Sequence, residues 1–238
     1  GSLVGVSACP GAIMSKTAVL VDGAFYLKRA ETIWGEKSPE VRAEELHKYV
    51  LSHITVHRNR SEEDGLRSLY RIFYYDCPPV DRISIYQPWD GRNTSYSVKR
   101  GAGRWRSAFH DEVGRLRKVA LRMGELSYKH ARYVPTEDAI KDLANARRSF
   151  DELGEGDFVI TGVKQTGVDM RIGLDVASLA AAHIVDQIIL VAGDSDFIPV
   201  AKAARRAGVD FIIDPMGSNI HQELRVQVDA VEDLTITP

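Results

Sequence analysis

Residues 190–200 read LVAGDSDFIPV and place two carboxylates, Asp194 and Asp196, directly after an apolar run that is typical of a buried strand. Two unit charges about 4 Å apart repel by about 4 kcal/mol at an effective dielectric constant of about 20. A protein keeps such a pair where a cation, a shared proton or open water relieves the repulsion. The stretch therefore predicts a strand end whose two carboxylates meet a cation, share a proton or face open water.

Composition limits the classes of protein that this chain can belong to. The chain has 238 residues, 44% of them hydrophobic and 27% charged, which is typical of a globular protein. Two cysteines are too few for a disulfide framework or a zinc site, so a reducing cytoplasm is the expected compartment. No apolar stretch reaches the roughly 18 residues of a membrane span, so no membrane partner is expected. The net charge of −2 favours no partner either, and homo-oligomerisation stays open.

Apolar runs without strict alternation, each followed by a helical pattern, recur along the chain. Residues 17–30 predict a strand, a turn at Asp22-Gly23 and then a helix. We expect further strands over 69–80, 157–165, 187–193 and 209–215, and further helices over 43–57, 109–124, 137–153, 170–184 and 197–208, with a closing helix and a short last strand within 219–234. This order predicts parallel βαβ units in a three-layer α/β sheet with helices on both faces. We expect residues 1–14 to be a tag remnant or a disordered extension, and 15–238 to be one domain with a basic insertion around 80–156.

Aspartates follow several of the predicted strands. Asp22 follows the first, Asp169 follows the strand over 157–165, and Asp194 and Asp196 follow the next. Ligands of open parallel sheets bind outside the carboxyl ends of the strands, so these side chains are expected to converge. Oxygen-only donors favour Mg²⁺ or Mn²⁺, which assist phosphodiester hydrolysis. Each aspartate taken alone is also a common helix cap, and that alternative stays open.

Four stretches together resemble the NYN family of PIN-like nucleases, most closely its bacterial LabA-like branch. They are TAVLVDGAFYLKRA (17–30), KQTGVDMRIGLDVASLA (164–180), ILVAGDSDFIPVAKAARRAG (189–208) and ELRVQVDAVEDL (223–234). The resemblance implies a Rossmann-like sheet, ribonuclease activity and acidic residues that hold Mg²⁺ or Mn²⁺. It implies catalytic and metal-binding roles for Asp22, Asp169, Asp194 and Asp196, and a further, outer metal position at Asp175. The family often has Asn three residues after its first Asp, where this chain has Phe25.

The middle of the chain is basic although the whole chain is not. Residues 92–122 contain nine Lys or Arg against two acidic residues, interleaved with aromatic residues. Cations that follow phosphates and rings that stack on bases are typical of single-stranded nucleic-acid binding. The expected contacts are Lys99, Arg100, Arg104, Trp105 and Arg106, joined by Lys164 beside the Gly-Val-Asp stretch. The alternative is a solvated basic helix face with buried aromatic residues.

Three functional hypotheses follow from these residues. The first is a metal-dependent endoribonuclease that hydrolyses single-stranded RNA, with DNA as the alternative substrate. The second is a haloacid-dehalogenase-like phosphatase, which requires an acidic residue two positions after Asp22; Ala24 stands there and argues against it. The third is a catalytically weak RNA-binding or regulatory module of the same fold, which Phe25 favours.

Overall fold

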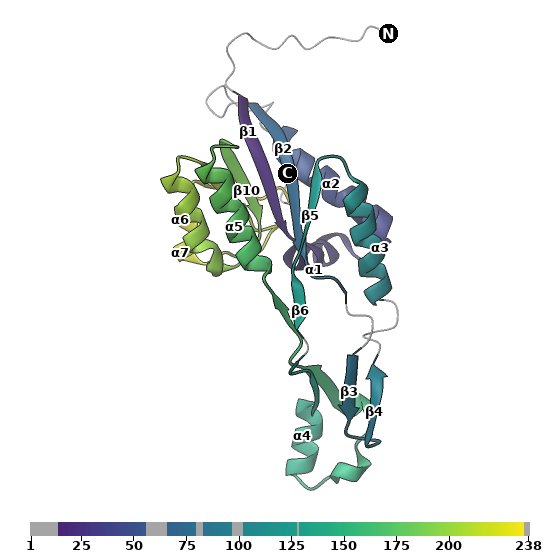
Figure 1. Cartoon of the computed structure of the whole chain (residues 1–238). Helices are drawn as coiled ribbons and strands as arrows, with labels where there is room; N and C mark the ends of the chain where they lie inside the picture. Colours follow the sequence, from purple (N-terminus) through teal and green to yellow (C-terminus); the bar gives the residue numbers. More distant parts are fainter. Residues whose placement is uncertain (1–13, 56–65, 80–82, 97–101, 128, 236–238) are drawn as a thin grey trace. The chain divides into compact units, whose positions relative to one another are not determined.

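The computed structural model describes residues 14–55, 66–79, 83–96, 102–127 and 129–235 (Figure 1). The chain forms two compact units. The first, called here the sheet unit, comprises residues 1–76, 109–123 and 168–238; the second unit comprises 77–108 and 124–167. One domain with an insertion over 80–156 stays a prediction. The unit boundaries fall elsewhere, because residues 119–123 supply a strand to the main sheet.

The sheet unit is built on a parallel sheet, as the sequence predicts. Among the described residues the strand order is β12-β11-β10-β1-β2-β5, and every neighbouring pair is parallel. The strands are β1 (Met14–Asp22), β2 (Leu66–Asp76), β5 (Val119–Met123), β10 (Gln187–Val191), β11 (Asp210–Asp214) and β12 (Ala230–Val231). Residues 18–21 of β1 and 188–191 of β10 are fully buried. Both faces of the central strands are therefore covered, which explains their continuous apolar runs.

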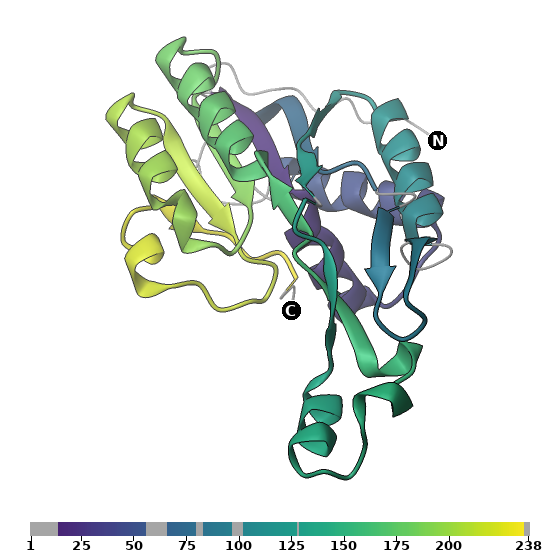
Figure 2. The ribbon, with the colours of Figure 1, turned by 60° about the horizontal axis from the view of Figure 1, so that its bottom comes forward.

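The order in which strands are added to the sheet reverses at its centre, between β1 and β10. From β1 the strands proceed outward to β2 and β5, whereas from β10 they proceed the other way to β11 and β12. Right-handed crossovers then place the connecting helices on opposite faces. Figures 1 and 2 show α5 (Val168–Ala181) and α6 (Ile198–Arg206) on one face, with α1 (Gly23–Trp34) and α2 (Pro39–Thr55) on the other. None of the described helices is long and apolar enough to span a bilayer.

One predicted helix is partly wrong. The apolar spacing over 109–124 favours a single helix, but α3 (Ala102–Arg115) ends before Leu116 and the chain turns at Lys118, whose φ is 64°. Residues 119–123 then form the edge strand β5, which pairs with β2. The long-range backbone pairing outweighs the local helical pattern. The closing segment contributes only the short helix α7 (Gln222–Arg225) and the strand β12.

In the described residues, the second unit comprises short antiparallel pairs, the first half of α3 and one further helix. The pairs are β3 (Ile83–Gln87) with β4 (Arg92–Tyr96), β6 (Glu125–Ser127) with β9 (Lys164–Thr166), and β7 (Arg132–Pro135) with β8 (Phe158–Thr161). The helix α4 (Glu137–Ala144) and the 3₁₀ turns η3 (Phe150–Glu152) and η4 (Glu155–Asp157) complete it. The strand predicted over 157–165 is thus two strands outside the parallel sheet. That part of the argument for Asp169 is wrong, and another element has to place this residue.

Candidate active site

Asp22 ends β1 and caps α1. Its Oδ1 accepts the backbone N–H groups of Ala24 at 3.1 Å and Phe25 at 3.2 Å. The turn needs Gly23, because a Cβ there would lie 2.5 Å from the Tyr74 ring and 2.6 Å from the Tyr75 carbonyl oxygen. Both cap bonds end on Oδ1 and leave Oδ2 outside the cap. Capping and ligand binding are therefore compatible in this one side chain.

Asp194 and Asp196 follow β10 at the same edge of the sheet. Asp194 caps the 3₁₀ turn η5 (Ser195–Phe197), and its Oδ1 accepts the Asp196 N–H at 3.0 Å. Both carboxylates are exposed. Since β1 and β10 are adjacent, Asp22 and Asp194 flank the point at which the strand order reverses. This is the usual ligand site of an open parallel sheet.

Asp169 reaches this edge from the first turn of α5, not from a strand of the main sheet. Its pKa is raised, first by partial burial and then by the negative charges of Asp194 and Asp196. Because α5 packs against η5, its N-terminal turn brings a third carboxyl-bearing segment to the site. The structure therefore unites the three acidic segments that the sequence points to.

Asp22 is coupled to the same group of carboxylates. Burial raises its pKa to about 6, the Phe25 N–H opposes the rise, and the charge of Asp169 adds to it. The Ala24 N–H lowers the pKa and Asp76 raises it further, by smaller amounts. A raised carboxyl pKa means that the charged form is destabilised where it stands. A bound cation would instead stabilise the charged form and lower the pKa of Asp22.

Asp175 differs from the other aspartates because side-chain donors already bind its carboxylate. Its Oδ2 accepts the Tyr75 hydroxyl at 2.7 Å and the Arg122 Nε–H at 3.0 Å. The negative charge thus already has a cationic partner. An outer role at the site, as the resemblance implies, stays a prediction.

Asp76 is a site residue that the sequence reasoning missed. It ends β2, next to β1, and its side chain is buried with 1% of the residue exposed. Its Oδ2 lies 2.8 Å from His110 Nε2 and within 3.5 Å of the Tyr74 hydroxyl. The signal was present, because Asp76 follows an apolar strand just as Asp22 does. The two prolines at 78 and 79 drew attention to the strand's end but not to its carboxylate.

A cavity of about 650 Å³ opens beside these carboxylates. Its lining joins Asp22 and Asp194 to a segment that follows β11: Asp22, Phe25, Gly193, Asp194, Ser195, Ser218, Asn219, Ile220 and His221. The sequence reasoning missed residues 218–221. They could have been found by the same rule, since β11 also ends at this edge of the sheet.

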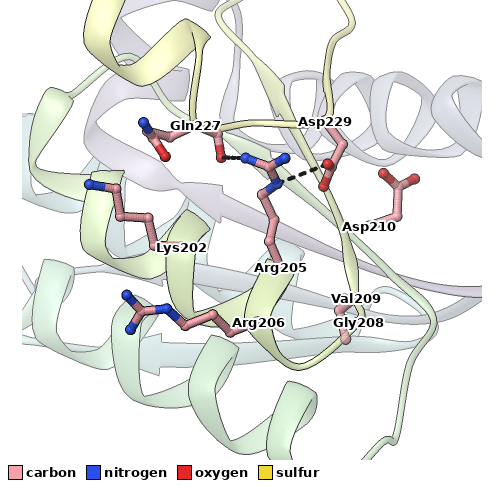
Figure 3. Close-up of a pocket in the computed structure, with 8 residues that line it drawn as sticks. All are labelled: Lys202, Arg205, Arg206, Gly208, Val209, Asp210, Gln227 and Asp229. Carbon is pink, nitrogen blue, oxygen red and sulfur yellow. Dashed lines mark hydrogen bonds and ion pairs between the residues drawn. The ribbon is translucent and has the colours of Figure 1, made fainter.

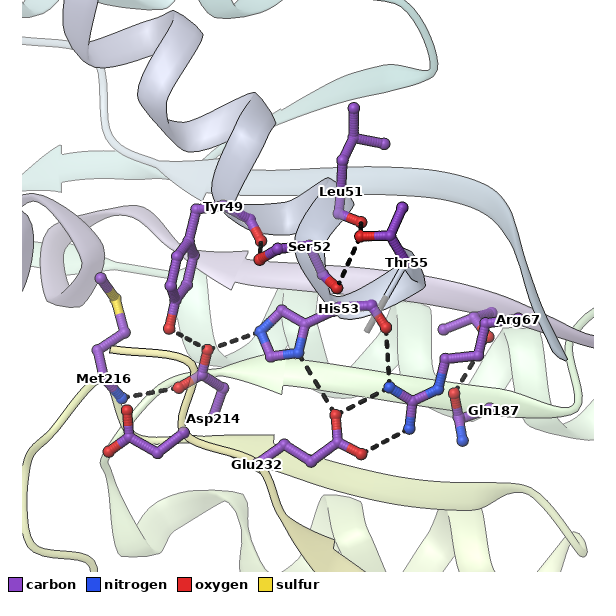
Figure 4. Close-up of polar contacts among 12 residues, drawn as sticks. Tyr49, Leu51, Ser52, His53, Thr55, Arg67, Gln187, Asp214, Met216 and Glu232 are labelled. Carbon is purple, nitrogen blue, oxygen red and sulfur yellow. Dashed lines mark hydrogen bonds and ion pairs between the residues drawn. The ribbon is translucent and has the colours of Figure 1, made fainter. Parts of the chain in front are cut away.

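A buried polar network holds the start of that segment (Figure 4). Asp214, the last residue of β11, accepts the Met216 N–H at 2.8 Å, and its other oxygen meets Tyr49 and His53 from α2. His53 Nδ1 lies 3.5 Å from Glu232, which Arg67 binds through two guanidinium N–H groups at 2.7 and 2.8 Å. The network thereby joins α2, β2, the end of β11 and the C-terminal segment at Glu232, and so holds the start of the segment that lines the cavity.

A second cavity, of about 700 Å³, carries none of the predicted site residues (Figure 3). It lies beside Asp210, where β11 begins, and so at the opposite edge of the sheet from the carboxylates. Arg205 spans it, bonded to Asp229 at 2.9 Å and to the Gln227 carbonyl oxygen at 3.4 Å. Its basic side chains lie in the last turns of α6, where they complement the helix dipole.

The acidic cluster suits a hard divalent cation by its chemistry. Within the described ranges, no three His, Cys, Asp or Glu side chains stand close enough together to form a preformed cage. Asp22, Asp169, Asp194 and Asp196 nevertheless offer only carboxylate oxygens, the donors that Mg²⁺ and Mn²⁺ prefer. Burial raises the pKa values of Asp22 and Asp169, and the neighbouring carboxylates add to the rise; a bound cation would oppose both effects.

The expected nucleic-acid contacts belong to the second unit. Lys99 and Arg100 lie outside the described residues, and of Lys164 only the backbone, in β9, is described. Arg104 is exposed in the first turn of α3, and Trp105 and Arg106 are half-buried. Their role in binding stays a prediction.

A parallel α/β sheet with carboxylates at its reversal point is the architecture of PIN-like nuclease domains. The family model described as the NYN domain matches residues 82–234, and the chain belongs to this family of PIN-like nucleases. The match includes Asp169, Asp194 and Asp196. Asp22 and Phe25 lie before it. Nuclease activity is general in the family, and the LabA-like branch stays a prediction.

Two further comparisons add no functional information. The crystal structure of a protein of unknown function from Vibrio parahaemolyticus superposes with a TM-score of 0.44 at 14% sequence identity, over 96% of each chain. A comparison with curated proteins finds no match.

Proposed function

We propose that this protein is an endoribonuclease that hydrolyses phosphodiester bonds of single-stranded RNA with Mg²⁺ or Mn²⁺. The observation that carries the proposal is the electrostatic coupling of Asp22, Asp169, Asp194 and Asp196 at the reversal point of the sheet. The negative charges of Asp194 and Asp196 add to the raised pKa of Asp169, and that of Asp169 adds to the raised pKa of Asp22. Family membership supports a nuclease reaction at this cluster.

Each carboxylate has a distinct part in the proposed site. Asp22 and Asp194 would hold a cation through the oxygens that their cap bonds leave over, while Oδ1 of each keeps the side chain in place. Asp169 and Asp196 would complete the set. When bound, the ion stabilises negative charge on the phosphoryl oxygens and makes an attacking water more acidic. Asp175 would act from outside through its bonds to Tyr75 and Arg122.

The proposed substrate follows from the second unit and the basic middle segment. Lys99, Arg100, Arg104, Arg106 and Lys164 would follow phosphates, and Trp105 would stack on a base. Such binding weakens steeply as salt concentration rises, because each neutralised phosphate releases counterions.

The test is cleavage of labelled single-stranded RNA and DNA oligonucleotides with Mg²⁺, Mn²⁺ or EDTA. We expect metal-dependent cutting of RNA that falls about a hundredfold or more in Asp194→Asn and Asp22→Asn, since stabilisation by a metal ion contributes several kcal/mol. Asp138→Asn is the matched control, because that carboxylate is 93% exposed on α4. Cutting that survives both site substitutions unchanged would contradict the proposal.

A second function is favoured by Phe25. This residue stands where the family often has Asn, and its ring lines the cavity. If it has displaced a group that catalysis needs, the protein binds RNA without cutting it. The same experiment separates the two functions: salt-sensitive binding without cleavage in Mg²⁺ or Mn²⁺ would favour the RNA-binding module.

A further inference from the structure

The lining of the cavity beside the carboxylates is chemically mixed. Asp22 and Asp194 contribute negative charge. Phe25 and Ile220 contribute an aromatic ring and an aliphatic side chain, and Ser218, Asn219 and His221 add polar groups. Its volume of about 650 Å³ lies within the roughly 300–1,000 Å³ that small-molecule sites occupy. An apolar surface with a few polar groups at its edge is suited to a planar, polar-edged ligand.

The Phe25 ring lies against the backbone of Gly193. A Cβ built on Gly193 would lie 2.7 Å from Phe25 Cε2, so a side chain at position 193 would require the ring to shift. The same Cβ would lie 3.4 Å from Ser218 Oγ. The backbone N–H of Phe25 is fixed by the cap bond to Asp22. The backbone of Phe25 therefore belongs to the same turn that orients Asp22, and its ring lies beside the backbone that leads into Asp194.

The polar groups of the wall have hydrogen-bonding capacity to spare. Asn219 is exposed, and its amide makes no hydrogen bond within the described part of the chain. His221 Nδ1 accepts the Glu223 N–H at 3.4 Å, which selects the tautomer with its proton on Nε2. Ser218 Oγ donates to the Pro215 carbonyl oxygen at 2.7 Å and keeps its lone pairs as acceptors. Donors and acceptors are thus both offered beside Phe25.

The turn that precedes Ser218 is bonded to other parts of the sheet unit. Arg29 of α1 donates to the Met216 carbonyl oxygen at 2.9 Å, and the Gly217 N–H donates to Asp233 at 2.6 Å. Gly217 has a φ of 71°, a conformation that favours glycine. Together with the bond from Met216 to Asp214, these contacts fix the turn that leads into residues 218–221.

We propose that Phe25, Ile220, Asn219 and His221 form a subsite for one unpaired nucleobase next to the scissile phosphate. The base stacks on Phe25, and its polar edge bonds to Asn219 and His221. This inference rests on the proposed function, because it takes the neighbouring carboxylates as the cleavage site. A base held in this way has left its pairing partner, so the subsite gives the enzyme its preference for single strands. Phe25 then has a binding role in the position where the family often has Asn.

The test is binding of labelled single-stranded RNA, followed by fluorescence anisotropy, to Phe25→Leu and to Phe25→Trp. The measurements use Asp169→Asn as the background, which prevents cutting and leaves the cavity lining intact. A second series of oligonucleotides carries one abasic nucleotide at successive positions. Phe150→Leu is the matched control, because Phe150 is exposed and does not line the cavity. Circular dichroism checks that each variant is folded.

We expect Phe25→Leu to weaken binding about tenfold, as removal of one base-stacking ring does, and Phe25→Trp to keep it. One abasic position should cause a similar loss with Phe25 present and little further loss in Phe25→Leu, because both changes remove the same contact. Equal binding by Phe25→Leu, or abasic substitutions that have no effect at any position, would overturn the subsite. If Phe25→Leu does not fold, the abasic series with Phe25 present decides.

Failure of the subsite and failure of the proposed function have different signatures. If the unmodified protein cuts RNA, and Phe25→Leu binds and cuts RNA equally well, the proposed function stands and the proposed subsite is wrong. If the unmodified protein never cuts RNA, but its binding depends on Phe25 and on one base as expected, the base-binding subsite stands and the proposed nuclease function is wrong.

Discussion

Two groups of ionisable side chains lie in the sheet unit and differ in how their charges are compensated. In the network of Figure 4, Asp214 meets His53 and Tyr49, and Glu232 meets Arg67 through two hydrogen bonds. In the acidic cluster of Asp22, Asp169, Asp194 and Asp196, the cap bonds come from backbone N–H groups, and the charges that shift the pKa values are those of other carboxylates.

The two groups differ in pairing because they differ in burial and in role. Buried charges that serve structure are paired, because an unpaired one costs several kcal/mol. In the acidic cluster Asp169, Asp194 and Asp196 are exposed, so the cost falls mainly on Asp22, whose raised pKa disfavours its charged form. The network of Figure 4 thus supports the fold, while the acidic cluster is compatible with the cation site proposed above.

The largest effect is expected from breaking the paired group. Burial lowers the pKa of His53, but hydrogen bonds to Asp214 and Glu232 and their charges outweigh burial and raise it. His53→Leu would leave the buried Asp214 carboxylate without its cation and should lower the free energy of unfolding by about 3 kcal/mol. Urea unfolding at about pH 6 measures it.

The sign of the pH dependence follows from the direction of that shift. A raised His53 pKa stabilises the fold fully below the unfolded value of about 6.5, and this contribution is lost as pH rises through the folded value. The unmodified protein and His53→Leu should therefore differ less in free energy of unfolding at alkaline pH than at about pH 6. Lys48→Leu, which breaks an exposed ion pair on the same helix, is the control and should leave the transition almost unchanged. A His53→Leu protein as stable as the unmodified one would contradict the role of the network.

The opposite effect is expected in the acidic cluster. Asp22→Asn keeps an oxygen for the cap bonds from Ala24 and Phe25 but removes the charge. The pKa of about 6, against 3.8 for an unperturbed aspartate, means that the charged form destabilises the fold near neutral pH. Asp22→Asn should therefore raise the free energy of unfolding by roughly 1–2 kcal/mol in EDTA at about pH 7.5.

This gain has its own pH window. The folded state binds more protons than the unfolded state between about pH 4 and pH 6, so the contribution of Asp22 falls as pH rises through that interval. The advantage of Asp22→Asn should be near zero below about pH 4 and complete by about pH 7. Urea unfolding across this range measures it, with Asp138→Asn as the control. A loss of stability at neutral pH would show that the Asp22 charge stabilises the fold.

The smallest effect is expected at Asp175. Tyr75→Phe removes one of its two donors and leaves Arg122, so the free energy of unfolding should fall by about 1 kcal/mol. Tyr70→Phe is the control, because that hydroxyl makes no hydrogen bond within the described residues. A loss of cleavage as large as that of Asp194→Asn would place Asp175 with the unpaired carboxylates and not with the paired ones.

The sequence predicted the parts of the site that are marked locally. Asp22, Asp194 and Asp196 follow apolar strands that lie side by side, so the strand-end rule placed them correctly at one edge. Asp169 reaches that edge through the first turn of α5, a route that the rule did not include. Asp76 obeys the same rule and was overlooked.

The parts that were missed depend on long-range contacts. His53 lies 161 residues before Asp214 and 179 residues before Glu232, and no local pattern pairs it with either. The apolar spacing of residues 119–123 predicts a helix, but their pairing with β2 outweighs it and makes them the strand β5. The strands β8 and β9 were assigned to the main sheet because their composition does not reveal their partners.

The unfolding free energies of the unmodified protein and Asp22→Asn, each measured at about pH 7.5 in EDTA and in saturating Mn²⁺, test the central claim most directly. Mn²⁺ at about a hundredfold over its Kd adds about 2.7 kcal/mol to a protein that binds it. Asp22→Asn should be the more stable protein in EDTA and the less stable one in Mn²⁺. An order that stays the same in both solutions, or an equal gain for both proteins, would contradict a cation site built on the unpaired carboxylates.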